Sequence, residues 1–228
     1  MVRERLNSAR DIIVLTAQQR CFWLFGALML LLISVPFVED TPNGKVTLSI
    51  CTLLVLMTGA AAVGRGGGST VISVLLAVPT AAFLAVALIY GESQFLLFSE
   101  LFGAAFFLIV TIYLLGYVFR RDVLTMDKLY GAAAAFLLIG VLWTYFYWIL
   151  LVLYPGALTM GGQPITHAPP PSTMLYFSYT TLTATGMGDI LPAQPVARML
   201  NMLEMISGVL YIAMLIARLA GTYTPPGR

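Results

Sequence analysis

The segment that decides the fold reads STMLYFSYTTL over residues 172–182 and continues as TATGMGD over residues 183–189. A triple proline at 169–171 precedes it, and Pro192 follows it. The apolar part predicts a helix of about eleven residues, which covers only about half of the roughly 30 Å hydrocarbon layer of a membrane. We therefore expect the chain to enter the membrane here and to return on the same side. Backbone that turns back at membrane depth lines water or is buried by protein, so we expect residues 183–189 to lie next to water.

The composition indicates that the whole chain lies in a membrane. Of its 228 residues, 60% are hydrophobic and only 10% are charged, and the formal net charge is +2. A soluble domain carries about 25% charged residues because its surface faces water. This deficit excludes a nucleic-acid-binding protein, a disordered regulator and an ordinary soluble enzyme.

Six other segments are long and apolar enough to cross a bilayer, which takes roughly 20 helical residues. These segments are 21–38, 46–63, 70–90, 95–119, 129–154 and 196–219. The charged first twenty residues are expected to form a short helix at the membrane surface. The expected fold class is an all-α membrane protein with six transmembrane helices and a re-entrant segment between the fifth and the sixth.

The basic residues indicate the orientation, because loops rich in Lys and Arg stay on the cytoplasmic side. With the N-terminus inside, ten of the twelve basic residues lie inside, and only Lys45 and Arg198 lie outside. We therefore expect both termini to be cytoplasmic.

The segment 183–189 resembles the selectivity filter of tetrameric potassium channels, which is usually written T-T-V-G-Y-G-D and is followed by a proline. Its residues are Thr183, Ala184, Thr185, Gly186, Met187, Gly188 and Asp189. The resemblance extends over about 129–221, and residues 204–221 look like the inner helix of small bacterial channels of this group. It implies a homotetramer in the inner (plasma) membrane of a bacterium. It further implies potassium ions in the filter, no cofactor, and no metal beyond the transported monovalent cations.

The residue types of this segment fit the chemistry of ion passage. Rings of backbone carbonyl oxygens replace the hydration shell of a potassium ion, and four chains around one axis close such a ring. Turning successive carbonyls toward the axis requires conformations that glycine reaches at positive φ without steric cost, as expected of Gly186 and Gly188. The C-terminal end of the short helix, at Thr180, Thr181 and Leu182, carries partial negative charge, which in the family points at a water-filled cavity.

Three positions depart from the family pattern. Ala184 stands where a threonine hydroxyl completes the innermost ion site, so one ring of ligands is missing. Thr185 replaces an aliphatic residue, and Met187 replaces an aromatic residue that ties the filter to its surroundings. Methionine is flexible and donates no hydrogen bond, so we expect a less rigidly held filter whose preference for potassium over sodium is left open.

Residues behind the filter are candidates for supporting it. Tyr176 could donate a hydrogen bond to Asp189, although a plain packing role is an equal alternative. Glu204 is the one acid well inside the last helix, where a charge is costly unless it is paired, is protonated or faces water. We expect Glu204 to brace the short helix through Thr180 or Thr181, and a proton-sensing gate is the alternative.

The last helix also holds the candidate hinge and gate. Gly208 lies where family members carry a hinge glycine, but a small residue also permits close helix packing in lipid. Val209, Ile212 and Ile216 share one helix face by their spacing. They line an apolar cavity or gate, or else take part in ordinary helix packing.

The sequence divides into four parts: an N-terminal segment 1–20, a four-helix transmembrane domain 21–128, a pore domain 129–221 and a cytoplasmic tail 222–228. The segment 95–119 contains no Lys or Arg, whereas a voltage sensor needs several arginines along one helix. We therefore expect no working voltage sensor, which leaves room for an unidentified regulatory ligand or subunit.

A passive channel that conducts potassium fits the sequence best. A weakly selective monovalent cation channel of the same fold and a non-conducting accessory membrane subunit are the alternatives. An enzyme is not expected, because the membrane helices offer only Glu100 and Glu204 and no histidine. A metal site lacks support as well, since Cys21 and Cys51 are the only cysteines of the chain and His167 is its only histidine.

Overall fold

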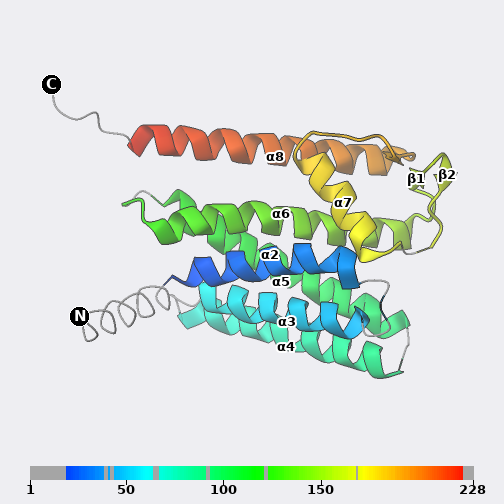
Figure 1. Cartoon of the computed structure of the whole chain (residues 1–228), viewed down its shortest axis with the longest axis horizontal. Helices are drawn as coiled ribbons and strands as arrows, with labels where there is room; N and C mark the ends of the chain where they lie inside the picture. Colours follow the sequence, from blue (N-terminus) through cyan, green and yellow to red (C-terminus); the bar gives the residue numbers. More distant parts are fainter. Residues whose placement is uncertain are drawn as a thin grey trace, which may run out of the picture.

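The computed structural model describes residues 19–38, 41, 44–63, 67–90, 93–120, 123–167 and 169–222. Its helices are α2 (Arg20–Val38), α3 (Gly44–Val63), α4 (Gly67–Tyr90), α5 (Ser93–Phe119), α6 (Met126–Leu153), α7 (Pro171–Leu182) and α8 (Pro195–Thr222) (Figure 1). Its strands are β1 (Leu158–Met160), β2 (Gln163–Pro164) and β3 (Ile190–Pro192). Most of the expected surface helix at 1–20 and of the tail at 222–228 lies outside the described residues.

Five helices in the described residues are long and apolar enough to cross a membrane. They are α2, α6 and the apolar parts of α3, α5 and α8, at Val46–Val63, Glu100–Phe119 and Pro195–Gly221. The third expected span is helical throughout as α4. Within the described residues, its apolar helix is Val74–Phe83, which is shorter than a membrane span. The prediction of a helical fold with several helices able to cross a membrane is confirmed, while the count of six spans stays a prediction.

A small antiparallel sheet, in the order β2-β1-β3, shows that the expectation of an all-α fold was wrong in detail. Met160 pairs with Gln163, so only Gly161 and Gly162 connect β1 and β2. Both glycines have positive φ, 57° and 80°, which is what a two-residue hairpin turn of type I′ requires. β3 joins the hairpin through the pairing of Met160 with Ile190.

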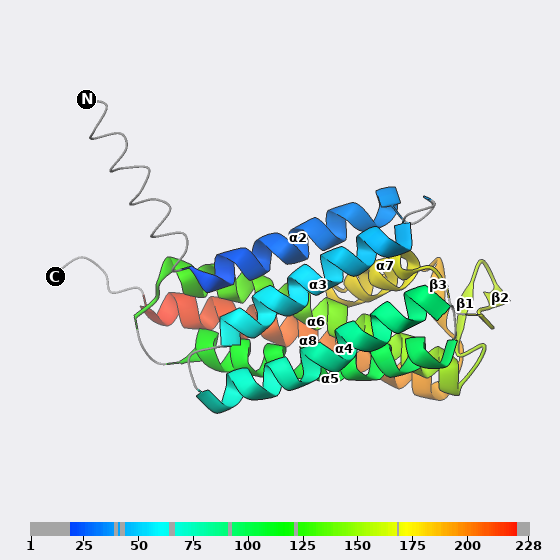
Figure 2. The ribbon, with the colours of Figure 1, turned by 90° about the horizontal axis from the view of Figure 1, so that it is seen from below.

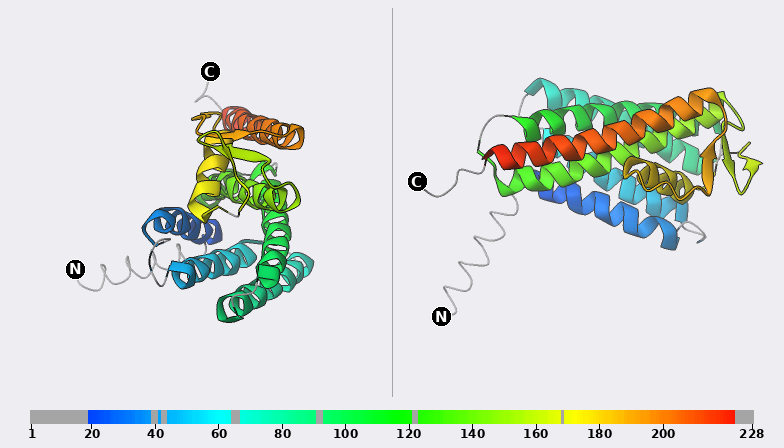
Figure 3. Two further views of the ribbon diagram at one scale, coloured as in Figure 1. Left: turned by 90° about the vertical axis from the view of Figure 1, so that its right-hand side faces the viewer. Right: turned by 90° about the horizontal axis from the view of Figure 1, so that it is seen from above.

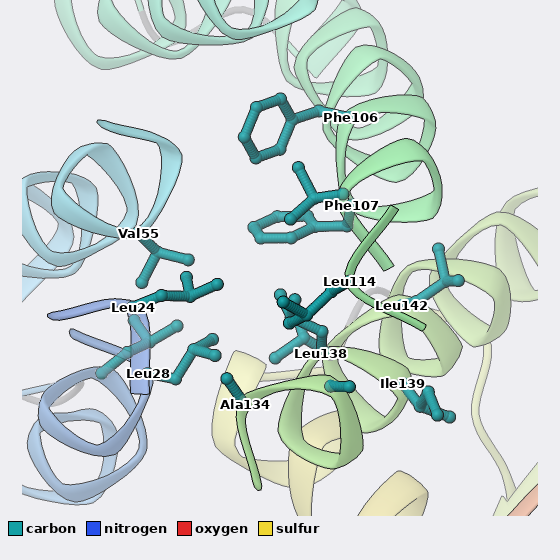
Figure 4. Close-up of a cluster of buried hydrophobic side chains, with 14 of the residues drawn as sticks. Leu24, Leu28, Val55, Phe106, Phe107, Leu114, Ala134, Leu138, Ile139 and Leu142 are labelled. Atoms are coloured by element: carbon teal, nitrogen blue, oxygen red, sulfur yellow. The ribbon is translucent and has the colours of Figure 1, made fainter. Parts of the chain in front are cut away.

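The main core joins α6 to the four helices that precede it. Leu24, Val55, Phe106, Phe107 and Leu138 are almost completely buried, and Figure 4 shows their side chains converging from α2, α3, α5 and α6. In lipid, such contacts stabilise the bundle through van der Waals packing rather than through removal of apolar surface from water. The core therefore fixes how the helices are arranged and gives α6 a rigid position.

The helix α8 lies at the edge of the molecule, on the far side of α6 and α7 from the other helices (Figures 1 and 3). It packs against α6, α7 and β3. Only 17% of its apolar span is buried within the single chain. Most of the surface of α8 is therefore apolar and faces outward.

Most of the described basic residues lie at one end of the bundle. Arg20 Nη1 donates to the Ala61 carbonyl oxygen at 3.3 Å, and Arg218 donates to the Arg120 carbonyl oxygen. Arg198 lies near the start of α8, at the opposite end, which carries the sheet (Figure 2). The expected orientation, with both termini in the cytoplasm, depends on this unequal distribution of basic residues between the two ends.

Candidate functional site

The candidate site is built around α7, which lies between α6 and α8 near the end of the molecule that carries the sheet (Figure 1). The helix begins at Pro171, directly after Pro170, whose φ of −54° and ψ of 147° are extended. Proline suits the first helical position because its fixed φ is helical and the amide hydrogen it lacks would have no partner there. The expected and observed helices agree within one residue.

Two glycines allow α7 to approach its neighbours closely. A Cβ at Gly140 of α6 would lie 2.5 Å from the Tyr179 ring, and a Cβ at Gly208 of α8 would lie 1.9 Å from the Leu182 carbonyl oxygen. The Tyr179 hydroxyl also donates to the Leu137 carbonyl oxygen at 2.7 Å. Of the two roles left open for Gly208, hinge or close packing, the geometry supports close packing.

The loop after α7 turns its amides back toward the end of that helix. The Ala184 amide donates to the Thr181 carbonyl oxygen at 2.8 Å, and the Thr185 and Gly186 amides both donate to the Thr180 carbonyl oxygen, at 2.8 and 3.1 Å. These two helix-terminal carbonyls, which would otherwise have no partner in the helix, are thus satisfied within the chain.

The carbonyl groups of residues 183–185 point the other way. All peptide bonds in the described residues are trans, and in a planar trans peptide the C=O and N–H groups point in opposite directions. Because the amides of 184–186 point at α7, the carbonyls of the preceding residues point away from it. All of 183–189 is exposed in the single chain, so the loop offers a row of backbone oxygens to its surroundings.

Alternate residues of the loop have positive φ. The angles are 54° at Ala184, 56° at Gly186 and 81° at Gly188, whereas Thr185 and Met187 have negative φ. Gly186 and Gly188 take the conformation expected of them. Ala184 was not expected to take it, and a left-handed conformation costs about 1–2 kcal/mol at a residue with a Cβ.

The two threonines of the loop bind each other and α7. Their hydroxyl oxygens lie 2.9 Å apart, and the Thr183 hydroxyl also donates to the Tyr179 carbonyl oxygen at 2.7 Å. Thr185 therefore takes part in a polar contact that an aliphatic residue could not make. The Met187 side chain is 64% exposed.

The far end of the loop is held by the sheet and by α7. The Gly161 amide donates to the Asp189 carbonyl oxygen at 3.2 Å, directly before β3 begins. The Tyr176 hydroxyl is within reach of the Asp189 side chain, as the sequence suggested. Desolvation, followed by a hydrogen bond with Asp189 and by its charge, raises the pKa of Tyr176 above its ordinary value.

Glu204 lies where α8 meets α6 and α7, and it bonds to α7, but not through the expected residues Thr180 and Thr181. It is completely buried, and its Oε2 accepts a 2.6 Å hydrogen bond from the Tyr147 hydroxyl of α6. Its Oε1 lies 2.6 Å from Oγ of Ser178 on α7. The expected partners have other roles: Thr180 bonds to its own helix, and Thr181 accepts from the amide of Asn201 at 3.0 Å, one turn before Glu204.

Tyr147, Ser178 and Asn201 are therefore the functional residues that sequence reasoning missed. They lie 57, 26 and 3 positions from Glu204, and each is an ordinary polar residue within an apolar stretch. The one available signal was that a buried acid in lipid needs polar partners, which does not say where in the sequence they are.

The candidate gate residues lie on the outward face of α8. Val209, Ile212 and Ile216 are 55%, 43% and 60% exposed in the single chain. Tyr211 faces the opposite way and donates to the Ala132 carbonyl oxygen of α6 at 2.6 Å. The three apolar side chains are thus free to line a space outside this chain, and they do not pack within it.

A metal centre has no set of three ligands in the described ranges. No three residues of the types His, Cys, Asp and Glu come together there. Cys21 and Cys51 are both buried and are not joined in a disulfide. The candidate site is therefore the row of backbone oxygens of residues 183–185, with α7 and the buried Glu204 behind it.

Comparison with known proteins gives one match, at the region that contains this site. Residues 129–224 match the family model described as Ion channel. No curated protein and no solved structure matches the chain. The matched region runs from the first turn of α6 to the end of α8, and it supports a passive ion channel in a membrane.

Proposed function

We propose that the chain forms a cation channel that conducts potassium, with α7 as the pore helix and residues 183–189 as the selectivity filter. The observation that carries the proposal is the direction of the backbone in this loop. The amides of 184–186 are bonded to α7, and the carbonyls of 183–185 face out of the chain. Outward carbonyls are the ligands that replace water around a potassium ion in a filter.

The channel is a homotetramer in this proposal, because one chain supplies only one side of a ring of carbonyls. The exposed loop and the outward apolar face of α8 are the surfaces that neighbouring copies would cover. Alternating positive and negative φ from Ala184 to Gly188 keeps successive carbonyls on one side of the loop. In this arrangement Val209, Ile212 and Ile216 line the pore on the cytoplasmic side of the filter.

The proposal places both termini in the cytoplasm of a bacterial cell, with six spans and the sheet outside. Arg20, Arg120 and Arg218 then lie at the cytoplasmic end, as loops rich in basic residues do. α5 has no Lys or Arg, so the four helices before α6 are not proposed to sense voltage.

A weakly selective cation channel is the second candidate, and two residues favour it. Ala184 provides no side-chain oxygen for the innermost ion site, and the exposed Met187 side chain cannot donate a hydrogen bond to hold the filter. A filter that is held loosely, with one ring of ligands missing, distinguishes potassium from sodium less well.

Flux from liposomes tests the proposal. The purified protein in vesicles loaded with potassium should release it down the gradient, and should release sodium more slowly under matched conditions. Equal rates for the two ions would favour the second candidate. Rates equal to those of protein-free vesicles would contradict a channel.

Two alanine substitutions sharpen this experiment. Gly186→Ala places a Cβ at φ 56°, which is strained by about 1–2 kcal/mol, so we expect the flux to fall. Gly26→Ala in α2 is the matched control, because a Cβ there meets nothing within 4 Å and φ is ordinary. Equal flux from both variants would show that the loop does not conduct.

A further inference from the structure

The buried acid Glu204 has hydrogen-bond partners on two helices and no cationic partner in the described part of the chain. The hydroxyls of Tyr147 on α6 and Ser178 on α7 bond to its carboxyl oxygens. Burial is the other factor that acts on the protonation of this carboxyl group. Tyr179 of α7 is the other titratable group facing it. On its own helix, Ser207 Oγ donates to the Glu204 carbonyl oxygen at 2.7 Å.

The hydroxyl of Ser178 makes it possible to count the protons in this cluster. Ser178 Oγ lies 2.6 Å from Glu204 Oε1 and 2.8 Å from the Gly140 carbonyl oxygen. A hydroxyl has a single hydrogen to donate, and a carbonyl oxygen only accepts. If Glu204 is ionised, its Oε1 only accepts as well, so one of these two short contacts brings together two acceptors without a hydrogen.

A proton on Glu204 resolves this conflict. The acid then donates from Oε1 to Ser178 Oγ, and Ser178 donates onward to the Gly140 carbonyl oxygen. Tyr147 donates to Oε2, and its own oxygen accepts from the amide of Asn201. Every short contact in the cluster then has one donor and one acceptor, and no charge is buried.

We propose that Glu204 is a neutral carboxylic acid that donates a hydrogen bond to Ser178 and thereby joins α8 to α7 and α6 behind the filter. Glu204 is a positioning residue here, since it acts on the filter only through α7. Only the effect of Glu204 on the filter rests on the proposed channel function. The direction of the hydrogen bonds stands on the cluster alone.

The consequence for function is a chain of hydrogen bonds that depends on one proton. Ser178 is bonded to Gly140, the position at which α6 admits the Tyr179 ring. Loss of the proton would turn Ser178 toward the new carboxylate and remove its hydrogen bond to the Gly140 carbonyl, which would then accept only from the Thr144 hydroxyl among these side chains. The pore helix would then lose one polar contact with α6 and keep that of Tyr179 with Leu137, and conduction should fall at alkaline pH.

Infrared spectroscopy of the full-length protein in lipid tests the protonation directly. A protonated carboxyl group gives a C=O stretching band that an ionised one lacks. We expect part of this band to disappear in Glu204→Gln and to persist in Glu100→Gln, the matched control for the other membrane glutamate. A band that is unchanged in Glu204→Gln would overturn the proposal.

A second variant covers the case in which Glu204→Gln does not fold. Ser178→Ala removes the acceptor of the proton, so the band of the acid should shift toward that of a carboxyl group without a hydrogen-bond acceptor. An unshifted band would contradict the proposed direction of the hydrogen bond.

Flux measurements separate this inference from the proposed function. Glutamine can donate to Ser178 and accept from Tyr147 as the neutral acid does, so Glu204→Gln should conduct within about twofold of the wild type and lose the decline at alkaline pH. A tenfold loss of flux at neutral pH in a folded Glu204→Gln tetramer would overturn the neutral acid. If no variant conducts but the band behaves as expected, the channel fails and the neutral acid stands.

Discussion

Substitution of Gly208 by alanine is the sharpest test of how α7 and α8 fit together. The added Cβ would lie 1.9 Å from the Leu182 carbonyl oxygen, whereas real Cβ contacts are essentially never shorter than 3.0 Å. The two helices must therefore separate by about 1.1 Å along this line. Leu182 presents a backbone atom, so no side-chain rotation can relieve the contact.

The energetic consequence has two opposing parts. Alanine is favoured over glycine within a helix by about 1 kcal/mol. Forcing an extra carbon into a packed interface costs about 1–3 kcal/mol and sometimes more, and here the obstacle is rigid. We therefore expect Gly208→Ala to be destabilising and to reduce flux, because the displaced carbonyl belongs to the peptide that leads into Thr183 and the proposed filter.

The assay is thermal unfolding in detergent, followed by intrinsic fluorescence, together with flux from liposomes. Gly26→Ala and Gly116→Ala are the controls, since a Cβ at either position meets nothing within 4 Å. These controls should unfold at or above the wild-type temperature, and Gly208→Ala several degrees below it. If Gly208→Ala unfolds with the controls and alters only opening, Gly208 is a hinge and the packing argument is refuted.

Four further outcomes are expected. Ala184→Thr should raise the permeability ratio of potassium to sodium by restoring a hydroxyl; Ala184 already bears the cost of a Cβ at φ 54°, to which the change adds the cost of branching at Cβ. Ala184→Val adds the same branching without the oxygen, and equal reversal potentials for both would refute the role of the hydroxyl. Tyr147→Phe should lower the free energy of unfolding by about 1–3 kcal/mol, because it leaves Glu204 Oε2 buried without a donor, while the exposed Tyr154→Phe should have no effect. Mass photometry in nanodiscs should give four copies of the chain, and a population of monomers or dimers alone would contradict the tetramer. Planar-bilayer currents should depend little on voltage, and steep activation would show that α5 was misread.

The helices could be predicted from the sequence because hydropathy and helix length are local properties. The expected segments 21–38 and 95–119 differ from α2 and α5 by one and two residues at their starts. The short helix was predicted equally well, since prolines mark its beginning and a change of composition marks its end. The hairpin was not expected, although Gly161-Gly162 is a typical signal for it.

The support behind the loop was less predictable, because it depends on how three helices rotate against one another. Glu204 was identified as a supporting residue from the cost of a charge in lipid, but its partners were placed at Thr180 and Thr181. They lie at Ser178 and Tyr147. Thr180, two residues after Ser178, lies on the opposite side of α7, whereas Thr181, three residues after it, shares its face and meets Asn201 instead. No local pattern specifies which side of α7 meets α8.

The loop 183–189 is fixed at both ends by its own chain, at one end by amides bonded to α7 and at the other by the bond from Gly161 to Asp189. Ordering a residue costs about 1–2 kcal/mol of conformational entropy, so ordering this loop costs on the order of 10 kcal/mol. Because these hydrogen bonds lie within one chain, folding of that chain offsets part of the cost without a second subunit. Association of four such chains would then join surfaces that are already shaped, which strengthens assembly for the same contact area.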